Sequence, residues 1–576
     1  GSSGPRAVAR GPGAPAARAR RGGPRMPLAT WDRWPPWTSL LSLYAHFGVC
    51  HFLARVLAGL CGRWRMKRML REVPAIRGTV HPLLGVLPEF IKNRYRLHHW
   101  RDEATRGFPV SKILGPVWDP AIVLVFVRDP VCLRHVLKDA FDKYTKADTR
   151  KDFPLSLLAK WIGPGIFTTQ HGPGAADKGA LWLHQRKIAA SIFTRSNFND
   201  NMCVVFASKA KELCAVLEAG KPTDMQKHFF SFTMDSIMKI LFGEESHTLG
   251  GEQSVVGTAY DNAHRALLGY MEQARASMSL LQFLPWPFGG VQGIAAWLRG
   301  RFSPLNRSFE ADVAILRRES TSIIDRCYDD PAKGERKDLL ALTLRALEQE
   351  KLPRSDATRV LHGMVGNFLI AGRDTTACAL SWMFYILATH DHIQDQVVAE
   401  VDRCVPAGTV PTLKMLSHSS MPLLHALVYE TLRLYPPVPV NIKEAMVDDV
   451  LPDGTPVPAG TRVVYFPWGM GRDPAVYQDP EQVRLERWVP FQQPPPHEFP
   501  VFQAGPRICL GMDMAILEMK LVTTMLLQQF TFTIAPEEAE KVHYSRTITM
   551  SVCNSKDQNS HNLWLTPHRR RVSEAR

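Results

Sequence analysis

The sequence has few cysteines, and they are not spaced as in a metal site or a disulfide framework. Ten cysteines are spread over 576 residues without a C-x-x-C pair or a close cluster. This argues against a zinc finger and against a small secreted domain held together by disulfides. Most of the ten are expected to be buried thiols, which pack as small hydrophobic side chains.

Glycine and proline are also too scarce for a fibrous or disordered chain. The 39 glycines and 43 prolines make up about one residue in seven. Disorder becomes the expectation at roughly one in four, so a collagen-like or wholly disordered protein is excluded. Hydrophobic residues at 45% and charged residues at 22% are typical of a globular protein.

Acidic residues are too few to balance the basic ones. There are 70 lysines and arginines against 55 aspartates and glutamates, which gives a net charge of +15. Such an excess favours an anionic membrane surface, an acidic protein partner or nucleic acid. Because no zinc-finger spacing or aromatic RNA-binding motif accompanies it, nucleic acid is not an expected partner.

The stretch with the character of a membrane anchor is not uninterrupted. Leu40 to Cys61 is mostly apolar, but His46, His51 and Arg55 fall within it. An arginine near the centre of a spanning helix costs about 2.5–3.5 kcal/mol. Near one end it can reach the interface, so residues 38–62 are predicted to be an anchor or an interfacial helix. The alternative is a buried helix of the globular domain.

The segments on either side of this stretch differ in character. Residues 1–37 are predicted to be a basic disordered or targeting segment, since the first thirty contain six arginines and no acidic residue. Met26 is an alternative start, and the choice stays open. Residues 63–85 are predicted to be a basic hinge in which Pro74 and Pro82 prevent continued helix. A basic flank after an anchor is typical of the cytosolic side of the membrane.

The rest of the chain is predicted to be mostly α with a small β part. Apolar periodicity indicates helices around 200–243, 308–325, 338–350, 355–403, 417–434 and 511–530. Short β-like runs occur at Ile122–Val127, Val463–Phe466 and Thr547–Val552. Residues 86–567 have no internal repeats or low-complexity linkers and are predicted to form one large domain, followed by a basic tail at 568–576.

The most specific segment is F-Q-A-G-P-R-I-C-L-G, Phe502 to Gly511, which precedes a helical stretch without proline. Its residue types suit a loop in which Cys509 binds a haem iron. Phe502 can shield the thiolate, while backbone N–H groups of the turn point at the sulfur. Gly505 permits the tight turn. The alternative is a Gly-Pro turn with an accidental cysteine.

The same loop contains two further residues suited to haem. Gly511 lets the following helix approach the porphyrin, and Arg507 can bind a propionate through charge-assisted hydrogen bonds. The pattern F-x-x-G-x-R-x-C-x-G resembles the haem-binding loop of the cytochrome P-450 superfamily, the haem-thiolate monooxygenases. The resemblance covers about Pro74 to Pro567. It implies a single large catalytic domain of the cytochrome P-450 fold, which binds haem b through Cys509.

Two further motifs follow the pattern of this superfamily. In W-L-H-Q-R-K, Trp182 and Arg186 are four residues apart and share a helix face. The resemblance implies that they contact a haem propionate. In E-T-L-R, Glu430 and Arg433 are three apart and can pair, and the resemblance implies that Arg487 joins them in a buried structural network. Leu485 stands where the family usually has proline.

The segment F-L-I-A-G-R-D-T-T-A, Phe368 to Ala377, indicates the type of reaction. Gly372 inside a helix costs roughly 1 kcal/mol relative to alanine, and Thr375 can divert a backbone hydrogen bond, so a local groove is expected. The resemblance implies that Asp374 and Thr375 relay protons for oxygen activation, which favours a monooxygenase over an isomerase or lyase. Ala371 stands where the animal fatty-acid branch often has a glutamate, so covalent attachment of the haem is not expected.

The electrons are expected to come from a partner protein. The sequence has no nicotinamide or flavin fingerprint. The resemblance therefore implies NADPH as the source, through NADPH–cytochrome P-450 reductase at the cytosolic face of the endoplasmic reticulum membrane. A plastid or mitochondrial location, with a ferredoxin as donor, stays open. The helix that bears Lys187 is a predicted docking surface for the acidic reductase.

Several stretches resemble the plant and algal fatty-acid ω-hydroxylases, among them F-T-M-D-S-I-M-K-I-L-F-G and Y-P-P-V-P. The implied substrate is a fatty acid or long-chain lipid, hydroxylated at or near its terminal carbon. A sterol, terpenoid or other apolar substrate is the alternative, and a non-catalytic haem-binding protein is a third reading. The resemblance predicts that the pocket is lined by residues from Lys151–Ile166, Phe368–Ala371, Val438–Ile442 and Thr547–Val552.

Overall fold

The computed structural model describes most of residues 68–570 and a few isolated positions between 50 and 64. Within 68–570 the positions not described are 79, 82–83, 116–122, 147–154, 173–178, 194–196, 198–200, 253, 279–303, 556–557 and 559. The predicted segment 1–37 and nearly all of the predicted anchor at 38–62 lie outside the described residues. No helix among the described residues is both long and apolar enough to cross a membrane.

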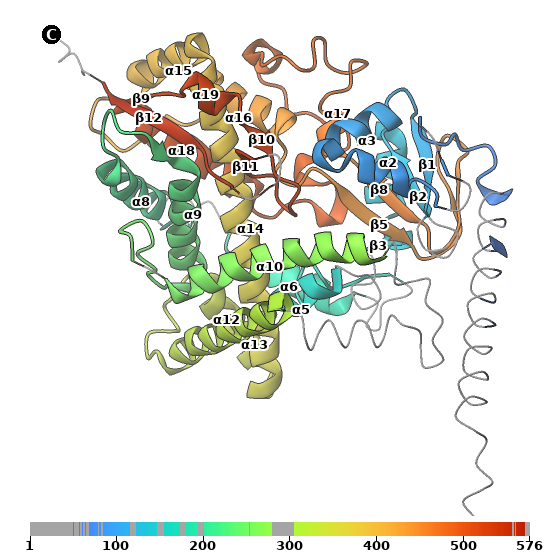
Figure 1. Cartoon of the computed structure of the whole chain (residues 1–576). Coiled ribbons are helices and arrows are strands. Elements are labelled where there is room, and N and C mark those ends of the chain that lie inside the picture. The colour runs from blue at the N-terminus through green and yellow to red at the C-terminus, as the bar shows by residue number, and fades with distance from the viewer. Residues whose placement is uncertain are drawn as a thin grey trace, which may run out of the picture.

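One side of the molecule is built around a five-stranded sheet (Figure 1). Its strand order is β1-β2-β8-β5-β3, with β2 and β8 parallel and the other neighbours antiparallel. The strands are β1 (Val110–Leu114), β2 (Val123–Val127), β8 (Arg462–Tyr465), β5 (Asn441–Ala445) and β3 (Tyr144–Thr145). Helices α2 (Leu87–Lys92) and α3 (Leu97–Thr105) lie beside it. β8 and β2 therefore agree closely with two of the predicted β-like runs.

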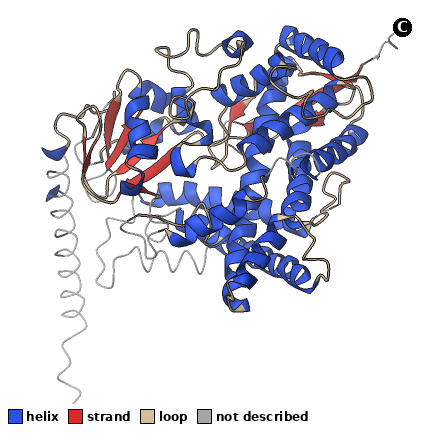
Figure 2. Ribbon diagram, turned by 180° about the vertical axis from the view of Figure 1, so that it is seen from behind, coloured by secondary structure: helices blue, strands red, loops and turns tan. Residues whose placement is uncertain are grey.

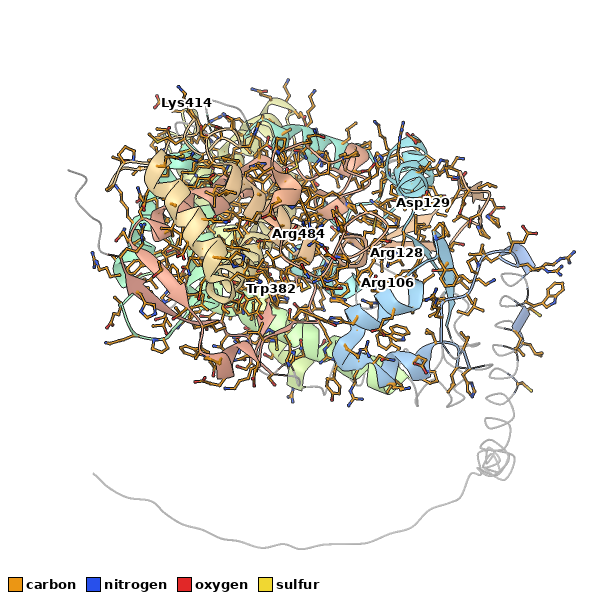
Figure 3. All side chains as sticks on the ribbon, turned by 90° about the horizontal axis from the view of Figure 1, so that it is seen from above. Arg106, Arg128, Asp129, Trp382, Lys414 and Arg484 are labelled. Carbon is orange, nitrogen blue, oxygen red and sulfur yellow. The ribbon has the colours of Figure 1, made fainter. Side chains whose placement is uncertain are left out.

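The sheet is fastened to α3 by a buried ion cluster. Arg128, at the end of β2, places Nη1 2.6 Å from Oδ1 of Asp102 on α3, and Arg106 pairs with the other carboxylate oxygen. Arg106 and Arg128 lie close together in Figure 3. Beyond Arg128 the chain turns into α4 (Pro130–Arg134), where the Asp129 carboxylate accepts the backbone N–H of Cys132 and caps the helix.

The other side of the molecule is a large helical body (Figure 2). Its helices are α5 (Leu155–Ile162), α6 (Ala180–Ala190), α8 (Cys203–Val216), α9 (Met225–Phe242), α10 (Val255–Met278), α12 (Pro304–Asp329), α13 (Leu339–Gln349), α14 (Arg354–Thr389), α15 (Asp391–Cys404), α16 (Pro422–Leu434) and α18 (Met512–Leu527). The predicted helical stretch 200–243 is two helices. Gly220 has a positive φ of 78° and Pro222 lacks an N–H donor, so α8 cannot continue into α9 as one helix.

Helix α14 runs through the middle of this body (Figure 1). Its 36 residues make it about 54 Å long, and it is buried over most of its surface. Trp382 on α14 stacks on Tyr435 at 4.1 Å between ring centroids, and its indole N–H donates to the carbonyl of Met550. The carboxyl-terminal part of the chain is thereby held against the central helix.

Gly372 allows two helices to pack closely. A Cβ atom at this position would lie 2.2 Å from Cδ1 of Ile237 on α9. The glycine therefore permits close packing of α14 against α9, and α14 is continuous through it. Gly372 also lines the main cavity, next to which a local groove was predicted.

The remaining strands form small sheets. β12 (Trp564–Arg569) pairs with β4 (Thr223–Asp224) and β9 (Phe530–Thr533), while β10 (His543–Tyr544) pairs with β11 (Val552–Cys553). β6 (Asp449–Val450) pairs with β7 (Pro456–Val457). The predicted strand at Thr547–Val552 is wrong for all but Val552. The side-chain hydroxyls of Ser545 and Thr547 bond to the carbonyl of Thr549 and hold this segment as a turn.

Candidate active site

The loop before α18 presents Cys509 to a cavity. The backbone N–H of Cys509 donates to the carbonyl of Phe502 at 2.8 Å, which closes the loop. Gly505 has a φ of +65°, and a Cβ atom there would lie 2.0 Å from the carbonyl oxygen of Leu137. Only glycine meets both demands, so the turn that orients Cys509 depends on it.

The Cys509 side chain is open to the cavity although protein surrounds it. Burial raises the pKa of its thiol, while a hydrogen bond from the backbone N–H of Gly511 and the charge of Arg186 act in the opposite direction. These two groups favour the thiolate, which is the form that binds metals. The predicted backbone donor is thus present next to the sulfur.

The cavity has a volume of about 230 Å3 and lies between the Cys509 loop and α14. Ala371, Gly372 and Thr375 of α14 line it, as does Phe502 of the loop. Other lining residues are mostly apolar, among them Phe193, Ile237, Phe368, Leu432 and Val438. Of the four stretches predicted to line the pocket, the first three each contribute a residue, and Thr547–Val552 contributes none.

Trp182 and Arg186 of α6 lie against the same loop. Nη2 of Arg186 donates to the carbonyl of Ile508 at 2.6 Å, next to the cysteine. The guanidinium of Arg507 lies over the Trp182 ring, 4.4 Å from its centroid. The structure therefore brings Trp182, Arg186 and Arg507 together at the cavity, although they come from regions about 320 residues apart.

Arg507 is held in place by His171, a residue outside the motifs of the sequence. Its Nη2 donates to Nδ1 of His171 at 2.9 Å and to the carbonyl of Thr169 at 2.8 Å. His171 is 2% exposed and stacks on Phe141. Burial and the charge of Arg507 lower the pKa of His171 to about 4, so the imidazole is neutral and accepts from the guanidinium.

Two lysines complete a cationic cluster beside Arg507. Lys146, directly after β3, lines the cavity, and Lys443 on β5 is 2% exposed. Burial, followed by the charge of Arg507, lowers the pKa of Lys146 to about 8. Burial, with the charges of Lys146 and Arg507, also lowers the pKa of Lys443. Sequence reasoning missed both lysines. The only available signal was the position of Lys443 shortly after Y-P-P-V-P.

This cluster tests whether the site fits a haem group. In the part of the chain that the structure describes, the charges that shift the pKa values of Lys146, Lys443 and Arg507 all belong to other cations. Buried cations without counter-charge are costly, and a ligand that carries carboxylates would remove that cost. Haem carries two propionates and takes a cysteine thiolate as an axial ligand. The donor set and Cys509 therefore fit haem together.

Asp374 and Thr375 are adjacent on α14 but face different surroundings. Thr375 lines the cavity, and its hydroxyl donates to the carbonyl of Ala371 at 2.6 Å. Asp374 is fully buried and its carboxylate binds Arg373 and the hydroxyl of Tyr260 on α10. The structure thus places the alcohol at the cavity, and the acid one residue away with other partners.

Glu430 and Arg433 form a buried pair on α16. Nε and Nη2 of Arg433 donate to the two carboxylate oxygens at 2.8 and 2.7 Å. Arg487 reaches the same carboxylate at 3.3 Å, and the indole N–H of Trp488 donates to it at 2.9 Å. All three predicted residues are therefore together, with Trp488 as a partner that the sequence did not reveal.

The fold around this site defines the class of protein. The structure superposes on the heme domain of cytochrome P450DA with a TM-score of 0.66 at 19% sequence identity, over 87% of this chain and 98% of that one. This likeness shows that the chain has the fold of a cytochrome P450 haem domain. The cytochrome P450 family model matches residues 80–560. The chain therefore belongs to the cytochrome P450 family.

Its relatives include cytochromes P450 of plants. Cytochrome P450 704C1 of Pinus taeda is 28% identical over 523 residues, which is 85% of this chain and 93% of that protein. Cytochrome P450 CYP94D108 of Paris polyphylla is 30% identical over 471 residues, 79% of this chain and 86% of that protein. Cytochrome P450 86B1 of Arabidopsis thaliana is 28% identical over 518 residues, 86% of each chain.

Membership of this family makes the protein a monooxygenase and implies haem b as its cofactor. When bound, haem supplies the oxygen chemistry, and the protein supplies binding, orientation and electrostatics.

Proposed function

We propose that the protein hydroxylates a fatty acid or another long-chain lipid at or near its terminal carbon. The observation that carries the proposal is the apolar lining of the cavity next to Cys509 and Thr375. Phe368, Leu432 and Val438 offer a hydrocarbon chain favourable burial, worth about 0.8 kcal/mol per methylene group. The sequence stretches that resemble plant fatty-acid hydroxylases support the same substrate class.

The residues around the cavity have different proposed roles. Cys509 would hold the haem iron, and Lys146, Lys443 and Arg507 would pair with the haem carboxylates. Arg186 and Trp182 hold the loop and the guanidinium of Arg507 in place. Asp374 and Thr375 move protons, as developed below. Electrons come from NADPH through a separate reductase at a membrane surface, which suits the net charge of +15.

An absorption titration tests the substrate class. The purified ferric protein is titrated with fatty acids of medium and long chain, and the Soret band is followed. We expect a shift from the low-spin to the high-spin position, because a chain that enters the cavity next to Cys509 would exclude water from the site of a bound haem. Phe368→Ala should weaken the response by about tenfold or more, since a large buried contact is lost.

A matched variant controls for general effects. Phe242→Ala removes a buried phenylalanine that does not line the cavity, so it should lower stability without weakening the spectral response. A normal haem-thiolate spectrum that ignores every fatty acid would refute the lipid assignment and favour a sterol or terpenoid. Oxygenated product at the terminal or adjacent carbon, dependent on NADPH and reductase, would establish the position.

A further inference from the structure

The carboxylate of Asp374 is surrounded by side chains from α10. The Tyr260 hydroxyl donates to Oδ2 of Asp374 at 3.1 Å, and Nδ1 of His264 lies 3.5 Å from the same oxygen. Arg373 donates to Oδ1 at 3.0 Å and also reaches Asp261 on α10 at 2.6 Å. In Figure 1, α10 passes across α14.

The carboxylate of Asp374 has no direct access to solvent. Its side chain is 0% exposed and does not line the main cavity. A proton taken from water must therefore reach it through one of its neighbours. Arg373 is an unsuitable donor: although burial lowers its pKa, Asp261 and Asp374 raise it more. The Tyr260 hydroxyl and His264 remain as carriers.

Tyr260, unlike His264, also borders a cavity other than the main one. It is one of the residues that line a second cavity of about 60 Å3 between α5, α12 and α14. Ser320 and Arg317 of α12 and His362 of α14 supply polar groups to the same cavity, and Arg317 is exposed. A water molecule needs only about 10–15 Å3 and a few polar partners. His264 does not line this cavity.

We propose that the Tyr260 hydroxyl connects water in the second cavity to Asp374, and so admits the protons that Asp374 passes towards the active site. The O–H proton of Tyr260 moves to the Asp374 carboxylate, while the phenol oxygen takes a proton from a neighbouring water. Tyrosine is neutral before and after, and the proton deficit passes along the waters to solvent. No electron is transferred.

Protonation also frees Asp374 to move. A neutral carboxyl loses most of its attraction to Arg373, which keeps Asp261 as its partner. The carboxyl of Asp374 can then turn about its side-chain bonds towards Thr375, its neighbour at the main cavity. Tyr260 thus acts through Asp374 and touches neither substrate nor cofactor. The proposal rests on the assignment of Asp374 and Thr375 to the proton relay.

Two substitutions test separately the Tyr260 hydroxyl and the water in the second cavity. Tyr260→Phe keeps the ring, which packs on Trp161 at 4.9 Å, and removes only the O–H group. Ser320→Leu leaves Tyr260 intact but fills the second cavity with a hydrocarbon. For both we expect a several-fold rise in peroxide released per NADPH consumed and a larger solvent isotope effect on turnover. The ferrous–CO spectrum should be unchanged.

Tyr144→Phe is the matched control. Tyr144 is also buried, and its hydroxyl donates to an aspartate, Asp449, at 2.8 Å. Its removal costs a comparable hydrogen bond whose acceptor is Asp449 and not Asp374, so the peroxide ratio should stay at the wild-type value. Wild-type peroxide ratios and isotope effects in both Tyr260→Phe and Ser320→Leu would overturn the proposal.

Double variants test whether Tyr260 works through Asp374. Tyr260→Phe should add nothing to the peroxide ratio of Asp374→Asn, whereas additive effects would place Tyr260 on another route and refute the proposal. Thermal unfolding without substrate should show the same non-additivity in the midpoint, because one hydrogen bond joins the two side chains. If fatty acids give no turnover, the substrate proposal fails by itself, and these comparisons are made with the compound that produces the largest Soret shift.

Discussion

Removal of the Arg433 side chain should be among the most destabilising single changes in this protein. Arg433 is completely buried and donates to both oxygens of Glu430. It also donates to the carbonyls of Gly471, Pro480 and Gln482, in the segment between α17 (Pro467–Met470) and the Cys509 loop. Arg433→Ala leaves a buried carboxylate and three carbonyls without this partner.

The expected cost follows from these contacts. Breaking a buried ion pair by removal of one partner costs about 3–5 kcal/mol. The total stability of a protein is typically about 5–15 kcal/mol, so the variant should lose a large share of it. Because Arg433 anchors the segment that leads to Cys509, we also expect loss of haem uptake. Arg433→Lys should be only partly better, since lysine cannot donate to two oxygens and three carbonyls in the same geometry.

Chemical unfolding and haem content measure the two effects. Arg359→Ala is the control, because Arg359 pairs with Asp356 at the same spacing on α14 but is 71% exposed. Exposed pairs contribute about 0.5 kcal/mol, so the control should unfold almost as the wild type does. If Arg433→Ala loses less than about 1 kcal/mol and retains full haem content, the inferred role of this network is wrong.

Three further predictions concern the cysteine, the threonine and an acidic residue of the sheet region. Cys509→Ala should abolish the thiolate-type ferrous–CO spectrum, and retention of that spectrum would remove Cys509 as the ligand. Thr375→Ala should raise peroxide released per NADPH, as measured with added reductase, because the alcohol at the cavity is lost; unchanged coupling would exclude it from the relay. For Asp449, burial raises the pKa, but hydrogen bonds from Lys143, His135 and Tyr144 outweigh this and lower it from 3.8 to about 2. The resulting stability, about 2 kcal/mol, is fully present above pH 3.8 and is lost as pH falls through 2. Asp449→Asn should therefore lower stability at neutral pH and flatten the acid limb of the unfolding curve.

Local patterns in the sequence predicted the parts of the site that lie on one element. The Cys509 loop depends on a turn that only glycine can make, and this demand is visible as a motif. Glu430 and Arg433 meet because a spacing of three residues places them on one helix face. β2 and β8 were predicted from short β-like runs, because fully buried strands are recognisable by their apolar character.

Parts of the site that depend on distant contacts could not be predicted. Lys146 and Lys443 are ordinary lysines until β3 pairs with β5 and brings them together. Tyr260 lies 114 residues from Asp374, and no spacing rule relates them. The packing of Gly372 against Ile237 could not be predicted from the sequence, because the two residues lie on different helices.

The position of the two lysines also bears on the order of assembly. Lys443 lies on β5 and Lys146 directly after the edge strand β3, whereas Cys509 and α14 belong to the helical body. Without a dianionic ligand, three like charges repel at this junction, and the sheet side is held less firmly. A ligand that binds both sides stabilises the folded state by mass action. Haem uptake should therefore protect backbone amides of β3 and β5 from hydrogen exchange, as well as those of the loop that carries its ligand.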